Sequence, residues 1–566
     1  MSGRRLVTSQ SSHLSQMTEH SEPTVEADSP NVAMSFLAHC KADPERPFLT
    51  ISGSFERRVL TFAEMRDMAC AYNAHFRARD LARGSVLAII LTHGPELYGA
   101  FLGALMAGLV PTLMPFPTPK QDRQRYWQSH AELFRRSEIR AVLTYRELDE
   151  EIRRHLDLDC LSLTDDVDPR RRDEAVRFNE LAVLQHSSGT TALKKGVMLT
   201  HKAILTQIDS YARFIGLTRQ SRIVSWLPLY HDMGFVACFL APMILGCEIS
   251  HLDAFLWSAR PTMLLDEIVA FGGEFIWLPN FAFNHIINNI RPTQSWDLSS
   301  VRAFINCSEP CKPASFERFA AQPQLHGLKA SALQVCYAMA ENVFAVTQTR
   351  MNETPRVLSI TNASLREGGR AMLAEDGDSS AVRFLSCGRP ISGVAVEIAE
   401  GAEPAAIGEI LISGTSLYSG YYRRPEATAE RLNNGWHRTG DIGFLWDGEL
   451  YVAGRVDDLL NIRGKNIYAH EVEDAINALR IAIPGRVVAF SVPNDALGTH
   501  DLVVLCETPG GALEGGAKKQ MREAVNAAFG VSLSRLGGVV PGTLIKTTSG
   551  KLSRNGNRDL FLGKEL

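Results

Sequence analysis

The chain has 566 residues, of which 45% are hydrophobic and 22% charged, and its formal net charge is −4. This length predicts two or more domains, and the small net charge gives no reason to expect a nucleic acid or an anionic membrane as a partner. The ten cysteines include no CxxC pair, which argues against a zinc site and fits reduced thiols in a cytoplasmic protein.

The N-terminal part offers neither a secretory signal nor a membrane span. Residues 1–30 are rich in Ser, Glu, His and Thr, and we expect them to be disordered. The longest apolar stretch, LYGAFLGALMAGLVPTLM, is interrupted by Pro111 and followed by Pro115. It predicts a buried helix followed by a strand, so we expect no integral membrane association.

Strands and helices alternate along the first part of the chain. A helical pattern over Thr61–Asp80 precedes the apolar run Ser85–Leu91, and a helix over Glu96–Met106 leads to VPTLM. Further strands are expected at Ala141–Tyr145, Leu181–Gln185 and RIVSWLP, with a helix over Lys202–Phe214. This order predicts an α/β fold with layered, mostly parallel sheets covered by helices.

The composition changes near Gly454, which indicates a domain boundary. Residues 455–566 show a helix from Ala469, the strands VVAFSV and DLVVLCE, and a helix from Lys518. We therefore expect an N-terminal domain over 31–454 and a small α+β domain over 455–566. The segment TPGGALEGG, Thr508–Gly516, is interpreted as a flexible surface loop.

A candidate phosphate loop, LQHSSGTTALKKGVML, spans Leu184–Leu199. It lacks the ending of a Walker A loop, because its lysine precedes the last glycine. It leaves a predicted strand and precedes a helix, where hydroxyls and backbone N–H groups can face the β- and γ-phosphates of a nucleotide. Taken alone, it is as consistent with a Ser/Thr-rich turn.

Three more segments carry candidate site residues. Glu341 follows the apolar strand ALQVCYA, where a carboxylate could hold magnesium on the phosphates, or could simply begin a helix. In WHRTGDIGFLWDGELYVAGRVDD, Asp441 could bind ribose hydroxyls and Arg455 ends a strand, although a turn aspartate and a surface cation are the plainer alternatives. Lys551 lies in KTTSGKLSRNGNR and would be a surface lysine if considered alone.

In this order, and over nearly the whole chain, the four segments resemble the adenylate-forming superfamily. The resemblance implies a large N-terminal domain, a small mobile C-terminal domain and a site for ATP and Mg²⁺ between them. A substrate carboxylate would attack the α-phosphorus to give an acyl-AMP and pyrophosphate. By resemblance, the phosphate loop would comprise Ser187, Ser188, Gly189, Thr190, Thr191 and Lys195. The loop sequence differs from the usual sequence of the superfamily at Ala192 and Lys194.

The resemblance also assigns roles to the other candidates. Glu341 would ligate magnesium, Asp441 and Arg455 would hold the ribose, and Lys551 would contact the reacting carboxylate and phosphate oxygens. Asp457 would be the hinge about which the small domain swings.

Within the superfamily, WLPLYHDMGF, LPNFAFNHI and NCSEP are similar to the fatty acyl-AMP ligases. That branch implies that Ser308, Glu309 and Tyr337 surround adenine and that His231 borders the reacting carboxylate. Candidates for the acyl pocket are Met233, Phe281 and Phe283, for each of which core packing is an equal alternative.

The branch further implies an insertion, here near Arg350–Ala381, that restricts transfer to CoA. The acceptor would then be the phosphopantetheine thiol of a separate acyl carrier protein. Three alternatives remain: a fatty acyl-CoA ligase, an amino-acid-activating enzyme that uses Asp232, and a catalytically silent acyl- or nucleotide-binding protein.

Overall fold

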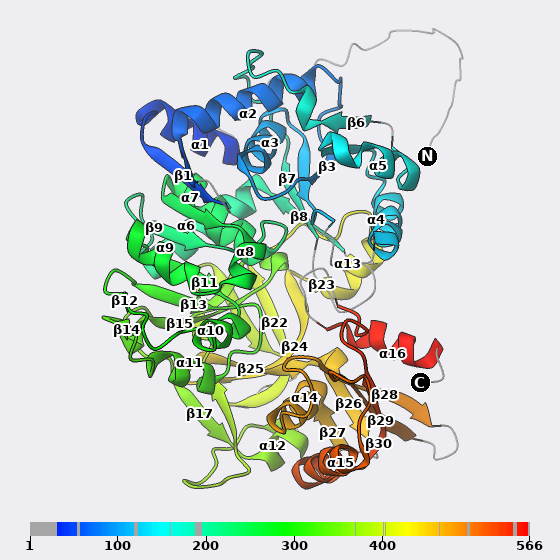
Figure 1. Ribbon diagram of the computed structural model, residues 1–566. Helices are drawn as coiled ribbons and strands as arrows, with labels where there is room; N and C mark the ends of the chain where they lie inside the picture. Colours follow the sequence, from blue (N-terminus) through cyan, green and yellow to red (C-terminus); the bar gives the residue numbers. More distant parts are fainter. Residues whose placement is uncertain are drawn as a thin grey trace, which may run out of the picture.

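A computed structural model describes residues 31–53, 57–117, 123–158, 160–186, 195–367, 369–399, 401, 403–462, 465–494, 499–546 and 552–563. The predicted disorder of residues 1–30 lies outside this range. The described chain is α/β, with parallel sheets at the top of Figure 1 and a smaller C-terminal unit, orange to red, below them. The predicted fold class is confirmed.

Two parallel sheets form the first part of the chain. The larger has nine strands in the order β2-β1-β10-β9-β11-β13-β15-β16-β20, and the smaller has the order β4-β3-β5-β6. The strands of the larger sheet are β2 Arg57–Thr61, β1 Pro47–Ser52, β10 Glu248–Leu252, β9 Arg222–Ser225, β11 Phe275–Leu278, β13 Ala303–Asn306, β15 Leu333–Ala338, β16 Ala345–Gln348 and β20 Arg389–Pro390. Those of the smaller sheet are β4 Val110–Leu113, β3 Val86–Ile90, β5 Ala141–Thr144 and β6 Cys160–Leu163. Only β2, β16 and β20, at the ends of the larger sheet, pair antiparallel to their neighbours among these described strands.

Helices cover these sheets, and the reasons lie in the local sequence. They are α1 Val32–Ala42, α2 Phe62–Arg77, α3 Pro95–Met106, α4 Arg123–Ser137, α5 Asp149–His155, α6 His201–Ile215, α7 Ala241–Leu245, α8 Ala254–Ala259, α9 Met263–Phe271, α10 Asn280–Ile287 and α11 Pro313–Ala320. A capping box of Thr61 and Glu64 begins α2. The long apolar stretch forms α3 and β4, as expected. A Cβ at Gly103 would lie 2.5 Å from the Tyr72 side chain, so a glycine here lets α3 pack closely on α2.

The middle of the chain forms a six-stranded antiparallel sheet that curves beneath the larger sheet. Its strands are β18 Gly369–Arg370, β21 Val394–Ile398, β22 Ala406–Gly414, β23 Leu432–Asn433, β24 Trp436–Trp446 and β25 Glu449–Arg455. The helix α13, Pro425–Arg431, precedes β23. Two small strand pairs are β12 Trp296–Asp297 with β14 Leu325–His326, and β17 Val357–Ile360 with β19 Val382–Leu385.

The expected insertion near Arg350–Ala381 is folded as β17, the helix α12 (Asn362–Glu367) and β18. Leu358 and Ile360 are buried with Phe444 and Tyr451 in a hydrophobic cluster of their own. The segment is thus more than a surface loop, because its apolar residues close a core against β24 and β25. Its helix α12 also approaches β27 of the C-terminal unit (Figure 1).

The C-terminal unit has its own hydrophobic core. Its elements are β26 Leu459–Ile462, β27 Lys465–Tyr468, α14 Ala469–Ala478, β28 Val487–Asn494, β29 Thr499–Glu507, α15 Gly515–Phe529, β30 Leu533–Val539 and α16 Arg554–Gly563. The helix expected from Lys518 begins at Gly515, three residues earlier, and Thr508 and Leu513 are buried. The loop interpretation of Thr508–Gly516 was therefore too long and too exposed.

Candidate nucleotide site

The turn after β15 places Glu341 at the junction of the two antiparallel strands β15 and β16, near one end of the larger sheet. Residues Ala340–Asn342 form one turn of 3₁₀-helix, and Val343 follows with φ 61° and ψ −54°. The Phe344 N–H donates to the Asn342 carbonyl at 2.6 Å, which makes Val343 the centre of a γ-turn of the rare, strained kind. A β-branched residue at positive φ costs free energy, and such strain is concentrated at functional sites.

A buried polar network holds this turn in place. The Gln207 side chain, on α6, donates to the Asn342 carbonyl at 2.9 Å and to the Ala345 carbonyl at 3.1 Å. The Ser416 hydroxyl donates to the Asn342 side chain at 3.0 Å. Because unpaired polar groups are costly inside a protein, these bonds fix the strained turn in one conformation.

The segment after β22 closes over the carboxylate of Glu341. The Tyr418 N–H donates to the Glu341 carbonyl at 2.8 Å, and the Tyr421 hydroxyl donates to Glu341 Oε1 at 2.8 Å. The Lys195 ammonium lies over the Tyr421 ring, 4.7 Å from its centroid. The structure thus brings together the predicted magnesium ligand and the predicted phosphate-loop lysine, through a tyrosine between them.

The phosphate loop joins two antiparallel strands, β7 (Leu181–His186) and β8 (Gly196–Thr200). As expected, the run leaves a strand, β7, and precedes a helix, α6; the short strand β8, which was not expected, lies between the loop and that helix. Apolar residues of β8 pair with β7, which explains why the run continues as a strand. The predicted loop residues Ser187, Ser188, Gly189, Thr190 and Thr191 lie outside the described residues, as do Ala192 and Lys194.

Asp441 and Arg455 are paired residues on the neighbouring strands β24 and β25. Arg455 Nε lies 3.1 Å from Asp441 Oδ1 as an ion pair, without the alignment of a hydrogen bond. The Tyr337 hydroxyl donates to Asp441 Oδ2 at 2.6 Å. Burial raises the pKa of the Asp441 carboxyl, and Arg455 and Tyr337 offset part of that effect. A carboxylate has about four acceptor positions, so two contacts leave room for ribose hydroxyls.

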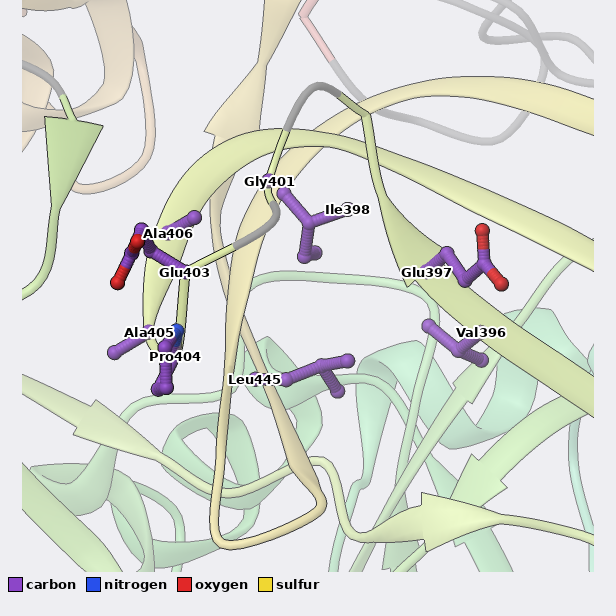
Figure 2. A pocket seen from close by; sticks show the side chains of 9 residues that line it. All are labelled: Val396, Glu397, Ile398, Gly401, Glu403, Pro404, Ala405, Ala406 and Leu445. Carbon is purple, nitrogen blue, oxygen red and sulfur yellow. The ribbon is translucent and has the colours of Figure 1, made fainter.

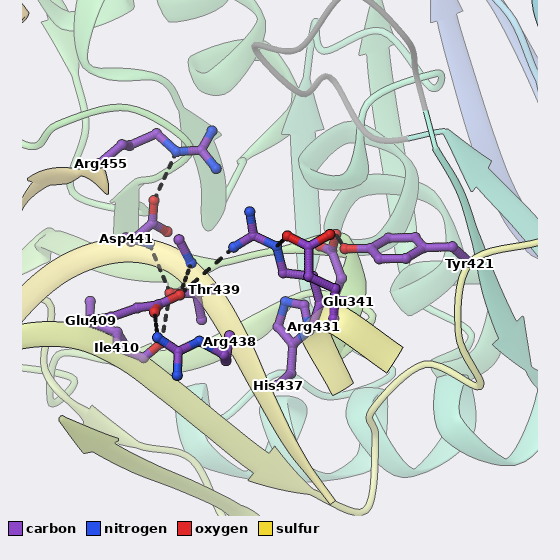
Figure 3. A network of polar contacts seen from close by, with 12 residues as sticks. Glu341, Glu409, Ile410, Tyr421, Arg431, His437, Arg438, Thr439, Asp441 and Arg455 are labelled. Carbon is purple, nitrogen blue, oxygen red and sulfur yellow. Dashed lines mark hydrogen bonds and ion pairs between the residues drawn. The ribbon is translucent and has the colours of Figure 1, made fainter. Parts of the chain in front are cut away.

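A second carboxylate supports the turn before Asp441. Glu409 Oε1 accepts the Gly440 N–H at 3.0 Å, and Glu409 is also paired with Arg431 and Arg438. Figure 3 shows these residues with Glu341, Tyr421, His437 and Arg455 in one polar network. Burial lowers the pKa of His437, which keeps this histidine neutral among the charges around it.

The SEP segment lies at the end of β13, beside α10. Ser308 has φ 67°, a strained conformation for a residue other than glycine. The Glu309 carboxylate accepts the Phe281 N–H at 3.0 Å at the start of α10. Tyr337 follows on the neighbouring strand β15, so the three residues predicted to surround adenine come from adjacent strand ends.

The candidate acyl-pocket residues lie in different surroundings. Met233 is buried at the start of a π-helix, Met233–Leu240, where the Asp232 side chain accepts its N–H at 2.8 Å; His231 immediately precedes this pair. Phe281 is 48% exposed and packs edge-on against Trp226 and Trp257. Phe283 is fully buried against Phe304, Phe316 and Phe319, the surroundings of a core residue.

The predicted hinge lies in a short 3₁₀ turn, Val456–Asp458, between β25 and β26. Asp457 is in this turn, and its neighbour Asp458 pairs with Arg554 at 2.6 Å. Arg554, at the start of α16, also binds Glu473 of α14 at 2.7 Å. The predicted catalytic Lys551 lies outside the described residues.

The described side chains around Glu341 form an open site rather than a closed metal cage. Among the described residues, no group of three or more His, Cys, Asp or Glu side chains is arranged to hold one. Mg²⁺ is usually bound by one or two carboxylates together with water and substrate phosphates. Glu341 offers one such carboxylate, whose Oε1 accepts a hydrogen bond from the Tyr421 hydroxyl. The residues present therefore fit a magnesium ion shared with a nucleotide, rather than a closed protein site.

A pocket of about 370 Å³ lies elsewhere, beside the turn between β21 and β22 (Figure 2). Its lining residues are Val396, Glu397, Ile398, Gly401, Glu403, Pro404, Ala405, Ala406 and Leu445. None of them is a candidate site residue, so the site is defined by the contacts around Glu341 and Asp441.

Several residues of the site were missed in the sequence. Gln207 carried a usable signal, because it interrupts the apolar face of α6 between Ile204 and Tyr211. Tyr421, His437 and Glu409 carried none, since their partners are distant in the chain.

The comparisons with known proteins agree with this geometry. A family model described as AMP-binding enzyme matches residues 36–422. The medium-chain fatty acid–acyl-carrier-protein ligase JamA of Moorena producens is 27% identical over 550 residues, covering 90% of this chain and 91% of that protein. A long-chain-fatty-acid–AMP ligase of Mycobacterium marinum is 31% identical over 445 residues, covering 69% of this chain and 70% of that protein.

A solved structure from a study of fatty acyl-adenylate ligases from E. coli and L. pneumophila has the same fold, with a TM-score of 0.85 at 24% identity over 95% of this chain and 99% of that one. These findings define a class of enzymes that use ATP to activate acids. The chain belongs to the AMP-binding enzyme family, in its fatty acyl-AMP ligase branch.

No helix in the described part of the chain is both long enough and apolar enough to cross a membrane.

Proposed function

We propose that this protein activates a fatty acid with ATP and then transfers it to a separate acyl carrier protein. A carboxylate oxygen of the acid attacks the α-phosphorus, the bond to the bridging oxygen of the β-phosphate breaks, and pyrophosphate leaves. The phosphopantetheine thiol then attacks the acyl carbonyl and AMP leaves. The observation that carries the proposal is that Tyr421 contacts Glu341 through its hydroxyl and Lys195 through its ring.

In this proposal the residues mainly align the substrates and neutralise the charge of the phosphates. Asp441 and Arg455 hold the ribose, while Ser308, Glu309 and Tyr337 surround adenine. Lys195 and the loop before it face the β- and γ-phosphates, and Lys551 faces the reacting oxygens. Glu341 would hold Mg²⁺, which supplies positive charge to the phosphates when bound. His231 borders the reacting carboxylate, and Met233, Phe281 and Phe283 are the candidates for contact with the acyl chain.

The acid and the acceptor are proposed from the relatives. JamA is named for a medium-chain fatty acid and an acyl carrier protein, and the Mycobacterium marinum relative for a long-chain fatty acid. The folded insertion supports a carrier protein over free CoA, because α12 approaches β27 of the unit that must rotate about Asp457. A fatty acyl-CoA ligase is the second candidate function.

We further propose that the enzyme works in the cytoplasm. All ten cysteines lie within the described residues and all are free thiols, which supports a reducing compartment.

The test is one purified enzyme, a panel of fatty acids from short to long, and two acceptors. Acyl-AMP is scored by mass after incubation with ATP and Mg²⁺, and product is then measured with a phosphopantetheinylated carrier protein or with CoA. We expect acyl-AMP with at least one chain length, transfer to the carrier, and little acyl-CoA. Efficient acyl-CoA synthesis would favour the second candidate, and a lack of ATP–pyrophosphate exchange with every acid would leave only a binding function.

A further inference from the structure

We propose that Tyr421 is a positioning residue that fixes Glu341 with its hydroxyl and Lys195 with its ring. The inference rests on the proposed function, because it assigns Glu341 to the metal and Lys195 to the phosphates. Tyr421 itself touches neither the substrate nor the nucleotide in this proposal; it acts through the two side chains that do.

The hydroxyl contact sets the orientation of the carboxylate. The Tyr421 O–H donates to Glu341 Oε1 at 2.8 Å, and Tyr421 is only 5% exposed. A hydrogen bond on Oε1 leaves Oε2 for a metal and prevents the carboxylate from rotating.

The ring contact sets the position of the lysine. The Lys195 ammonium lies 4.7 Å from the centroid of the Tyr421 ring, within the range of a cation–π interaction. The Tyr418 ring packs edge-on against the Tyr421 ring, with the two ring centroids 5.0 Å apart. The lysine is therefore held over a ring that is itself fixed by packing.

The backbone around Tyr421 is bonded to the start of β8, which Lys195 immediately precedes. Val197 and Tyr421 form an antiparallel bridge, and the Tyr422 N–H donates to the Gly196 carbonyl at 2.8 Å. On the other side, the Tyr421 N–H donates to the Thr428 hydroxyl at 2.9 Å. The tyrosine thus ties three distant parts of the chain, at positions 195, 341 and 421, into one unit.

Two substitutions separate the two contacts. Tyr421→Phe removes the hydroxyl and keeps the ring, while Tyr421→Leu removes both. Calorimetry measures ATP binding at increasing Mg²⁺ and also without metal. We expect Tyr421→Phe to raise the Mg²⁺ concentration for half-maximal effect about tenfold, since a bond to a charged group is lost, and to leave metal-free ATP affinity within about twofold. Tyr421→Leu should show the same metal effect and, in addition, a metal-free ATP affinity several-fold weaker.

The matched control is Tyr422→Phe, on the neighbouring residue, whose ring faces Arg423. It should bind ATP and Mg²⁺ as the wild type does. A magnesium titration of Tyr421→Phe that superimposes on wild type would overturn the proposal, as would equal metal-free affinities of the phenylalanine and leucine variants. Tyr421→Met replaces the leucine variant if the latter does not fold. ATP binding needs no fatty acid, so a wild type that makes no acyl-AMP would count against the proposed function and not against Tyr421.

Discussion

Asp441 illustrates how much one side chain depends on its neighbours in this site. Its two oxygens face the Tyr337 hydroxyl and the Arg455 guanidinium, and burial raises its pKa. The aspartate is thus oriented before any nucleotide arrives, which is the arrangement expected of a group that binds ribose hydroxyls.

Replacing Asp441 with Asn should weaken ATP binding. The amide keeps the shape but removes the charge opposite Arg455, and we expect KM for ATP to rise about tenfold or more while kcat changes less. Steady-state kinetics of acyl-AMP formation measure both constants. Asp447→Asn, on an exposed turn of the same hairpin, is the control and should behave as wild type. An unchanged KM in Asp441→Asn would remove this residue from the ribose site.

The buried His201 should make the free energy of unfolding depend on pH. Its Nδ1 accepts the Val32 N–H at 3.0 Å, and burial lowers the pKa of His201 to about 4. In the unfolded chain His201 is protonated below about pH 6.5, whereas in the folded protein it stays neutral down to about pH 4. Its contribution to stability is therefore fully present above pH 6.5 and is lost as the pH falls from 6.5 to 4.

In His201→Gln, the loss of unfolding free energy between pH 7 and pH 5 should be smaller than in wild type by roughly 2 kcal/mol. Urea denaturation at the two pH values measures this difference. His326→Gln, at an exposed site, should leave the pH dependence unchanged. Equal losses in wild type and His201→Gln would show that folding does not lower the pKa of His201.

At the scale of elements, the contact between α16 and α14 rests on an ionic triad. Arg554 lies between Asp458 and Glu473, and the side chains of all three are at most 20% exposed. Glu473 also accepts the Ala489 N–H at 2.9 Å, which extends the triad to β28.

Arg554→Ala should therefore destabilise the C-terminal unit by roughly 3–5 kcal/mol at pH 7, because two carboxylates lose their shared cation. Burial already raises the pKa of Glu473, and without Arg554 it should rise further. Protonation of Glu473 at lower pH then removes the cost of its unpaired charge. The stability deficit of Arg554→Ala relative to wild type should therefore shrink toward pH 5. Chemical denaturation at several pH values tests this, with the exposed Lys519→Ala as a control. A deficit that grows with acidity would contradict the triad.

The elements also show what the sequence could and could not predict. The helix α3 and strands such as β3 were predictable, because continuous apolar runs and periodicity are local properties. The hairpin β7–β8 was not, since Gly196–Thr200 is too short to distinguish a strand from the start of a helix. Glu341, Asp441 and Arg455 were identified from motifs, whereas Tyr421 and Gln207 act through partners more than 75 positions away. The strained conformation of Val343 has no sequence signal, because valine normally avoids positive φ.

At the scale of the whole molecule, the insertion and the C-terminal unit meet where α12 approaches β27. Deleting all of Arg350–Ala381 would also expose Phe444 and Tyr451, which Leu358 and Ile360 cover. A replacement confined to α12 is therefore the cleaner way to free the C-terminal unit.

A variant with Asn362–Glu367 replaced by Gly and Ser should still form acyl-AMP and should gain acyl-CoA synthesis. The reason is that the contact with β27 no longer opposes rotation about the hinge. The measurement is the ratio of product with CoA to product with the carrier protein. Replacing Asp376–Ser380, an exposed turn of the same insertion, by Gly and Ser is the control and should leave the ratio unchanged. A CoA activity that stays absent in the α12 variant would mean that another feature selects the acceptor.

Strand β24 has a consequence for anyone who wishes to engineer the choice of acceptor. Asp441 and Phe444 are three positions apart on this strand, the first in the candidate nucleotide site and the second in the hydrophobic cluster of the insertion. Phe444 stacks on Tyr451 of the neighbouring strand, so repacking of that cluster shifts the same backbone that carries Asp441. We therefore expect acceptor preference and affinity for ATP to be linked. A library built on the insertion should be screened for both at once, because we expect variants selected for CoA alone to lose nucleotide binding.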